Sequence, residues 1–279
     1  MEHPPSPSFK PVQFGLLVAL GLTALYAVIY QKQPLPGTWN DIYLNLMIAI
    51  PALLAAAAAL LVWRSFAPGD RPKSVWLAFS LGLILWAVAE VIWFWLWFVN
   101  GDVPAIALPD VFWLAGLVPF CLAFVLQYRV IYYFTRREAI IWSVLILVAT
   151  LVVAAVATLM LVSWGSLAEG ESLLVTYLNV YYAVSDAAML IAALGLGHLF
   201  GRGLWGRAWL ALLVFVISDG LYSYVEMSGM YAQSVETGNI LTLVVDATYS
   251  LAYMLMALGV YSQYLLVRHG PTLLPPIED

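Results

Sequence analysis

Eight apolar stretches constrain the fold of this chain more than any other feature of its sequence. They lie at residues 12–30, 42–63, 75–99, 107–128, 139–164, 173–200, 205–227 and 240–267. About 20 apolar residues in a helix span the hydrocarbon core of a bilayer. The composition, 64% hydrophobic and 10% charged, also lies far outside that of soluble domains. We therefore predict an all-α, polytopic membrane helix bundle with eight transmembrane helices that contact the lipid bilayer.

The basic residues predict how these helices are oriented. If all eight stretches cross the membrane, ten of the eleven Lys and Arg residues lie on one side and only Lys32 lies on the other. The positive-inside rule then places both termini in the cytoplasm, and we expect a prokaryotic inner (plasma) membrane. The first stretch lacks a small-residue cleavage pattern, so we interpret it as a retained helix and not a signal peptide. The net charge of -5 gives no reason to expect a nucleic-acid partner.

A set of matched residues predicts an internal duplication. The tripeptide Tyr-Leu-Asn occurs at residues 43–45 and again at 177–179, and Trp76 is matched by Trp209. Two acids of the first half also have counterparts in the second, because Asp219 and Asp246 take the places of Glu90 and Asp110. Each half would hold four crossings, so we predict a 4+4 parallel repeat with halves at 1–134 and 135–279, related by an axis along the membrane normal.

Five acids lie inside or at the edge of the apolar stretches, in the predicted outer half of the membrane: Glu90, Asp110, Asp186, Asp219 and Asp246. Aromatic residues share their helix faces, because residues three or four apart lie on one side of a helix. We expect the acids and these aromatics to form one outward-facing pocket between the halves. The predicted ligand- or proton-binding residues are Glu90, Asp110, Asp186, Asp219, Asp246, Trp93, Tyr182, Tyr222 and Tyr249.

The sequence places no Lys, Arg or His at the depth of these acids. An unpaired carboxylate in a medium of low dielectric constant takes up a proton unless water, a metal ion or a cationic ligand compensates its charge. Protons, cations and amines are therefore the expected guests. In the alternative interpretation, each acid is protonated and hydrogen-bonded to a tyrosine or tryptophan, and it only holds helices together.

Several chemistries lack the residues that they need. The spans contain no central lysine for a retinal Schiff base and no central histidine for haem. The sequence also lacks a Cys or His cluster for zinc and a Ser/His/Asp set for acyl transfer. We therefore predict no catalytic residues and no metal site, favour a protein that is not an enzyme, and identify no cofactor. Binding of Ca, Mg or Mn by carboxylates alone stays open.

Residues 86–116 carry a family resemblance. A glutamate, Glu90, lies in a tryptophan-rich span that is followed by the motif PDVFWLAG at residues 109–116. This pattern resembles polytopic sensory input modules that stand upstream of bacterial and archaeal diguanylate cyclases and histidine kinases. The resemblance implies membrane sensing of a small or lipophilic signal, with no catalytic role for the matched acids. The chain ends soon after the last stretch, so we expect any output domain to belong to a separate signalling partner.

Three functional hypotheses follow. The first is a stand-alone sensory or ligand-binding module that takes a small cationic or lipophilic ligand. The second is a proton- or cation-coupled small-molecule transporter, because acids near the midplane of a duplicated bundle are also typical of that class. The third is an accessory subunit of a larger membrane complex, in which the tryptophans face lipid or a partner.

Overall fold

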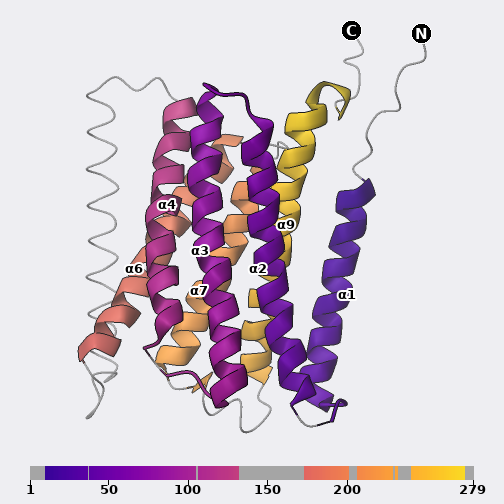
Figure 1. Cartoon of the computed structure of the whole chain (residues 1–279), viewed down its shortest axis with the longest axis vertical. Helices are drawn as coiled ribbons and strands as arrows, with labels where there is room; N and C mark the ends of the chain where they lie inside the picture. The colour runs from indigo at the N-terminus through magenta and orange to yellow at the C-terminus, as the bar shows by residue number, and fades with distance from the viewer. Residues whose placement is uncertain are drawn as a thin grey trace.

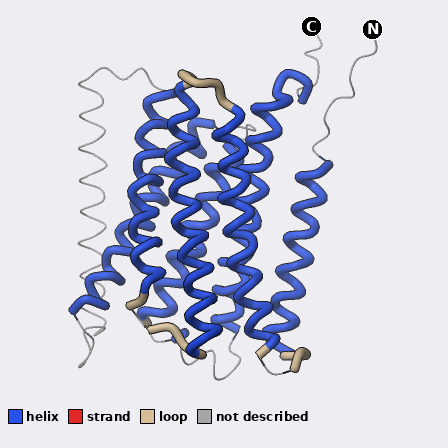
Figure 2. Tube along the Cα trace, viewed as in Figure 1, coloured by secondary structure: helices blue, strands red, loops and turns tan. Residues whose placement is uncertain are grey.

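The computed structural model describes residues 10–36, 38–104, 106–131, 173–200, 206–228, 230–231 and 240–273. In these ranges every regular element is an α-helix, and seven helices are long and apolar enough to cross a membrane (Figures 1 and 2). They are α1 (Lys10–Lys32), α2 (Trp39–Ser65), α3 (Arg71–Asn100), α4 (Leu108–Ile131), α6 (Leu173–Phe200), α7 (Arg207–Met227) and α9 (Ile240–Leu273). They agree with seven of the predicted spans. The remaining predicted span, 139–164, lies outside the described residues.

The ends of α3 follow from its sequence. Asp70 precedes the helix in an extended conformation, and its carboxylate accepts a hydrogen bond of 2.8 Å from the backbone N–H of Ala67. Pro72 follows in the first turn, where a missing N–H costs no helical bond. At the other end, Gly101 adopts a left-handed conformation with φ of 77° and donates its N–H to the carbonyl of Trp97. These signals fix where the 30-residue helix begins and ends.

The helices pack into one bundle whose order in space differs from their order in the chain. Helix α3 lies between α2 and α4, while α9 packs against α1, α2 and α7 (Figure 1). Helix α6 packs mainly against α7 and makes a smaller contact with α4. The last helix therefore joins the two halves of the chain.

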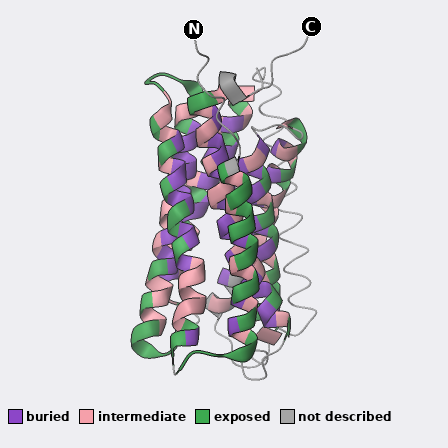
Figure 3. Ribbon diagram, turned by 90° about the vertical axis from the view of Figure 1, so that its right-hand side faces the viewer, coloured by how far each residue is buried: buried purple, intermediate pink, exposed green. Residues whose placement is uncertain are grey.

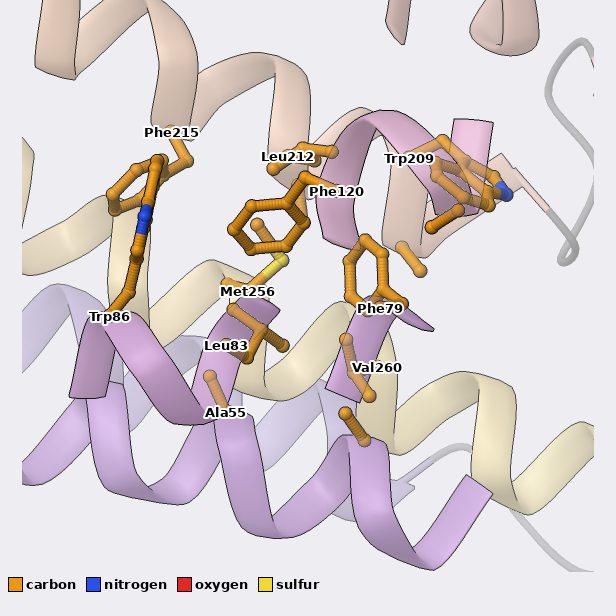
Figure 4. Packing of buried hydrophobic residues seen from close by; sticks show 14 of the residues in the cluster. Ala55, Phe79, Leu83, Trp86, Phe120, Trp209, Leu212, Phe215, Met256 and Val260 are labelled. Carbon is orange, nitrogen blue, oxygen red and sulfur yellow. The ribbon is translucent and has the colours of Figure 1, made fainter. Parts of the chain in front are cut away.

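An aromatic core lies where α3, α4, α7 and α9 meet. The rings of Phe79, Phe120 and Trp209 face one another, with centroids 5.5 Å apart for Phe79–Phe120 and 5.4 Å apart for Phe79–Trp209 (Figure 4). Trp86 packs on Phe120 at 4.9 Å. Gly116 of α4 makes this possible, because a methyl group on its Cα would overlap the Trp86 ring. Small residues at helix contacts are typical of membrane bundles.

The outer surface of the bundle is apolar. Large hydrophobic side chains such as Phe14, Leu17, Val118 and Ile240 are each more than 65% exposed. Exposed residues occur along the whole length of the helices and not only at their ends (Figure 3). A soluble protein rarely exposes so many large apolar side chains. This surface supports the prediction of a multi-pass protein in contact with the lipid bilayer.

Basic residues gather at one end of the bundle. Helices α1 and α3 begin, and α2, α4 and α9 end, at the same end in Figure 1. The first or last turns of these helices carry basic residues, including Lys10, Arg64, Arg71 and Arg129. Lys32 lies at the opposite end of α1. This separation agrees with the predicted sorting of charge, while the compartment on each side stays a prediction.

The duplication stays a prediction, and one part of the proposed matching is wrong. Glu90 follows Trp76 by 14 positions in the continuous helix α3, whereas Asp219 follows Trp209 by 10 positions in the continuous helix α7. A difference of four residues is about one turn, or about 6 Å along the axis. The tryptophan pair and the acid pair therefore cannot both be structurally equivalent. The helix pairs α3–α4 and α7–α9 do pack together in both halves, as a repeat would require.

Candidate functional site

Glu90 lies in the interior of the bundle and accepts two tyrosine hydroxyls. Its side chain is 5% exposed. The hydroxyls of Tyr249 and Tyr253, both on α9, donate to its Oε1 at 2.9 and 2.8 Å, and the two hydroxyl oxygens lie 3.5 Å apart. The tyrosines are four residues apart, so one face of α9 presents both donors. This small network connects α3 to α9 across the core.

Aromatic rings hold this network in place. Phe215 of α7 packs against Tyr253 at 4.6 Å and against Trp86 at 5.0 Å. The indole N–H of Trp86 donates to the backbone carbonyl of Trp113 at 2.9 Å. The buried Nε1 of Trp113 interacts electrostatically with Glu90 but does not meet the geometry of a hydrogen bond. Glu90 therefore has a fixed orientation in a shell of rings.

A carboxyl pair lies beside Glu90. Asp186 of α6 is 6% exposed, and its carboxyl group interacts with that of the half-buried Asp219 on α7. Among the described residues, no N–H or O–H group donates to the buried Oδ2 of Asp186. Because two neighbouring carboxylates repel each other when both are ionised, this arrangement favours a proton on one of the two groups. Asp219 also interacts electrostatically with Glu90. We call Glu90, Asp186 and Asp219 the central acid cluster.

The basic residues of these helices are remote from the cluster along the chain. Arg71 at the start of α3 precedes Glu90 by 19 residues, and Arg207 at the start of α7 precedes Asp219 by 12. At 1.5 Å per residue, these separations are about 28 and about 18 Å along the helix axes. The immediate neighbours of the acids are instead tyrosine hydroxyls and other acids. The cluster therefore suits the binding of a proton or of a small cation.

Asp110 has a different environment, because its carboxylate organises the start of α4. Its Oδ2 accepts the backbone N–H of Ala107 at 2.8 Å, and its Oδ1 accepts the hydroxyl of Tyr182 at 2.8 Å. Tyr182 lies on α6, so the second bond ties α6 to α4. In the sequence, Tyr182 shares a helix face with Asp186, which lies one turn further along α6. In the structure its hydroxyl donates to Asp110 instead, so both carboxylate oxygens of Asp110 accept a hydrogen bond.

Asp246 forms a separate group near the first helix. It is 8% exposed, and the hydroxyl of Tyr231 donates to its two oxygens at the long distances of 3.3 and 3.4 Å. Burial, followed by the charge of Asp246, raises the pKa of the Tyr231 phenol well above 10.0, so this hydroxyl stays a donor at neutral pH. The other neighbours of Asp246 include Tyr26 and Tyr30 of α1. Asp246 and its tyrosines therefore form a group of their own beside the central acid cluster, and the single pocket stays a prediction.

The aromatic residue that follows an acid by three positions is not that acid's partner. Tyr249 follows Asp246 but donates to Glu90. Trp113 follows Asp110 but lies beside Glu90 as well. Residues three apart share a helix face but differ in depth by about 4.5 Å. The aromatic side chain therefore reaches the acid of a neighbouring helix.

The other two predicted aromatics pack against further rings. Trp93 packs on Trp113 with centroids 5.8 Å apart. Tyr222 packs on Tyr249 at 5.7 Å and on Tyr231 at 5.3 Å, so it lies between the central acid cluster and the group around Asp246. Tyr253 was not among the predicted site residues, although its position four residues after Tyr249 places it on the same helix face and could have identified it as a partner of Glu90. Tyr231, which donates to Asp246, was not predicted either, because no neighbouring residue in the sequence marks it as a site residue.

The described residues contain no group of three or more His, Cys, Asp and Glu side chains arranged to hold a metal ion. Cys121, on α4, is exposed on the helix surface. The comparisons add no functional information: no protein-family model, no curated protein and no solved structure matches the chain. The geometry of the acids and their hydrogen-bond partners is therefore the basis for a functional proposal.

Proposed function

We propose that this chain is a multi-pass membrane sensory or ligand-binding module, and that its central acid cluster binds the signal, a proton or a small cationic ligand. The contact between the carboxyl groups of Asp186 and Asp219 carries this proposal, because it needs a positive charge between two acids. Glu90 supplies a third carboxyl group nearby, with its orientation fixed by two tyrosines. The resemblance of residues 86–116 to sensory input modules agrees with this function.

Occupancy of the cluster can be converted into helix movement. If the shared proton leaves and nothing replaces it, two negative charges about 4 Å apart repel each other by about 4 kcal/mol at an effective dielectric constant of about 20. The two charges lie on different helices, α6 and α7. Helix α6 makes only a small contact with α4, through groups such as Tyr182 and Tyr128. Movement of α6 away from α7 is therefore the expected response.

Distance measurements between spin labels test this mechanism. Labels at the exposed positions Leu199 of α6 and Val125 of α4, in a Cys121→Ser background, would report on α6 in proteoliposomes between pH 5 and pH 9. We expect the distance distribution to change with pH in the parent. A variant with both Asp186→Asn and Asp219→Asn should keep the low-pH distribution throughout, because two amides can hydrogen-bond without a proton.

A matched control separates this effect from a general response to charge. Asp102→Asn removes an exposed acid from the α3–α4 connection and should leave the pH response of the parent intact. The proposal fails if the parent shows no pH-dependent change, or if the Asp186/Asp219 variant responds as the parent does. Native mass spectrometry of the gently purified parent then identifies any small molecule that is bound in addition to protons.

The carboxyl pair also favours a second function, that of a proton-coupled transporter. Acids that share a proton between helices are suited to carry protons across a membrane. In that case a pH gradient across proteoliposomes should drive proton uptake, followed with an internal pH-sensitive dye. The uptake should be lost in Asp186→Asn and retained in Asp102→Asn. A sensor would show the helix movement without proton flux.

A further inference from the structure

We propose a second ligand site between α1, α2 and α9, in which Asp246 and the hydroxyls around it bind a small protonated primary amine. The site is distinct from the central acid cluster and does not depend on the function proposed for that cluster.

Three hydroxyl oxygens in this region are buried and have no hydrogen-bond partner: those of Tyr30, Tyr43 and Thr242. They come from α1, α2 and α9 respectively. Thr242 is 0% exposed. A buried polar group without a partner destabilises the fold, so three in one region are unexpected unless something else satisfies them. Buried polar groups are normally paired.

Two of these hydroxyls, those of Tyr30 and Thr242, lie near Asp246. Thr242 precedes Asp246 by four residues, so α9 presents both on one face. Tyr30 interacts electrostatically with Asp246 and lies close to the hydroxyl of Thr242, although that contact does not meet hydrogen-bond geometry. The buried Tyr26 interacts with Asp246, Tyr30 and Tyr43. A carboxyl group, unused oxygens and aromatic rings therefore occupy one region.

The backbone around this region is held in a fixed arrangement. Asn40 clamps the connection between α1 and α2 by accepting the N–H of Leu35 at 3.0 Å and donating to its carbonyl at 2.7 Å. One turn beyond Asp246, Ser250 donates to the carbonyl of Met47 at 2.6 Å and ties α9 to α2. Tyr26 packs with Leu243 and Ala247 in a hydrophobic cluster of its own. The groups are therefore positioned before any ligand arrives, which lowers the entropic cost of binding.

The unused oxygens select among cations. A primary ammonium has three N–H donors, which match the Asp246 carboxylate and two hydroxyl oxygens, while its alkyl chain can lie against the tyrosine rings. A quaternary ammonium would also interact with the rings and the carboxylate, but it has no N–H donor and would leave the hydroxyls unsatisfied. A sodium ion would use the oxygens but not the rings. The combination favours a protonated primary amine.

The site lies near one end of the bundle, where an amine could enter from water. Tyr30 lies two residues before the end of α1, and Thr242 lies in the first turn of α9. This end carries Lys32 and lies opposite the end where Lys10 and Arg64 are found. A cation that approaches the site therefore avoids most of the positive charge of the protein.

Binding of propylammonium chloride to the purified full-length chain in detergent tests the proposal, with saturation-transfer NMR of its methyl signal at pH 7 and constant ionic strength. We expect saturable binding, and an affinity at least tenfold lower for tetramethylammonium. Asp246→Asn should weaken the binding of propylammonium at least tenfold. Asp41→Asn, which removes an exposed acid from the first turn of α2, is the matched control and should bind as the parent does.

Two further variants keep the test decisive. If Asp246→Asn does not fold, the combination of Tyr30→Phe and Thr242→Val removes two acceptors and should weaken binding several-fold. Glu90→Gln alters the central acid cluster and shows whether the amine binds there instead. Loss of binding in Glu90→Gln but not in Asp246→Asn would place the amine at the central acid cluster and refute the second site.

Three other results would also overturn the proposal. They are the absence of saturable binding to the parent, equal affinities for tetramethylammonium and propylammonium, and competition by sodium at equal concentration.

Discussion

The two tyrosines on Glu90 give a quantitative prediction about stability. Tyr249 and Tyr253 donate to the same carboxyl oxygen at 2.9 and 2.8 Å. A single Tyr→Phe change removes one hydrogen bond and leaves the oxygen with the other. A neutral hydrogen bond contributes about 0.5–1.5 kcal/mol, and the average inside membrane bundles is about 0.6 kcal/mol. We therefore expect each single variant to lose about 1 kcal/mol of unfolding free energy.

The double variant Tyr249→Phe/Tyr253→Phe should lose more than the sum of the two. It leaves the buried Oε1 of Glu90 with no hydroxyl donor, and an unsatisfied buried acceptor costs about 1–3 kcal/mol. We expect a total loss of about 3 kcal/mol, and thus a coupling energy of about 1 kcal/mol between the tyrosines. Adding Glu90→Leu to the double variant should restore part of this stability, because it removes the orphaned acceptor together with its donors.

Unfolding of the purified chain by SDS in mixed micelles, followed by tryptophan fluorescence, measures these free energies. Tyr181→Phe changes an exposed tyrosine on α6 and should be within about 0.5 kcal/mol of the parent. Single variants that lose less than about 0.3 kcal/mol, combined with an additive double variant, would show that the hydroxyls contribute nothing specific. The network around Glu90 would then not hold α3 to α9.

Two further predictions concern packing and topology. Gly116→Ala should destabilise the bundle by about 1–3 kcal/mol in the same SDS assay, because the new methyl group overlaps the Trp86 ring; Gly21→Ala, which has nothing within 4 Å of the new methyl group, should be neutral or stabilising. An impermeant maleimide added to intact cells should label a cysteine at Asp102 but not one at Ala67, since these positions lie in connections at opposite ends of α3. The reverse pattern would invert the orientation predicted from the basic residues.

The fold was predictable from the sequence wherever hydrophobicity alone decides the structure. Seven of the expected spans are helices with ends close to the predicted ones, because a bilayer leaves an apolar segment little choice but to form a helix. Signals such as Asp70 and Gly101 also fix local boundaries. The packing order was not predictable in the same way. Apolar helix surfaces resemble one another, so nothing in the periodicity of α9 shows that it packs against α1, α2 and α7.

The candidate site was predicted in its members but not in its connections. The acids were identifiable because a carboxyl group inside an apolar span is costly. Their partners depend on the rotation and depth of neighbouring helices, which one sequence does not specify. Tyr182 and Tyr249 therefore have different acids as partners from those that their own helices suggested. The tryptophan pair and the acid pair were matched together although they differ by one helical turn, because similar residues one turn apart occupy nearly the same face.

The contact between α1 and α9 also has a consequence for how the protein is made. Tyr26 lies in α1 and Asp246 in α9, which are the first and the last of the described helices in chain order. The proposed amine site around Asp246 therefore cannot form until α9 has followed the other described helices into the membrane, and until then α1 has only α2 as a neighbour among them. A quality-control system that recognises an unpaired acid in the membrane would thus meet Asp246 late in synthesis. Arrival of α9 brings Asp246 to its neighbours on α1.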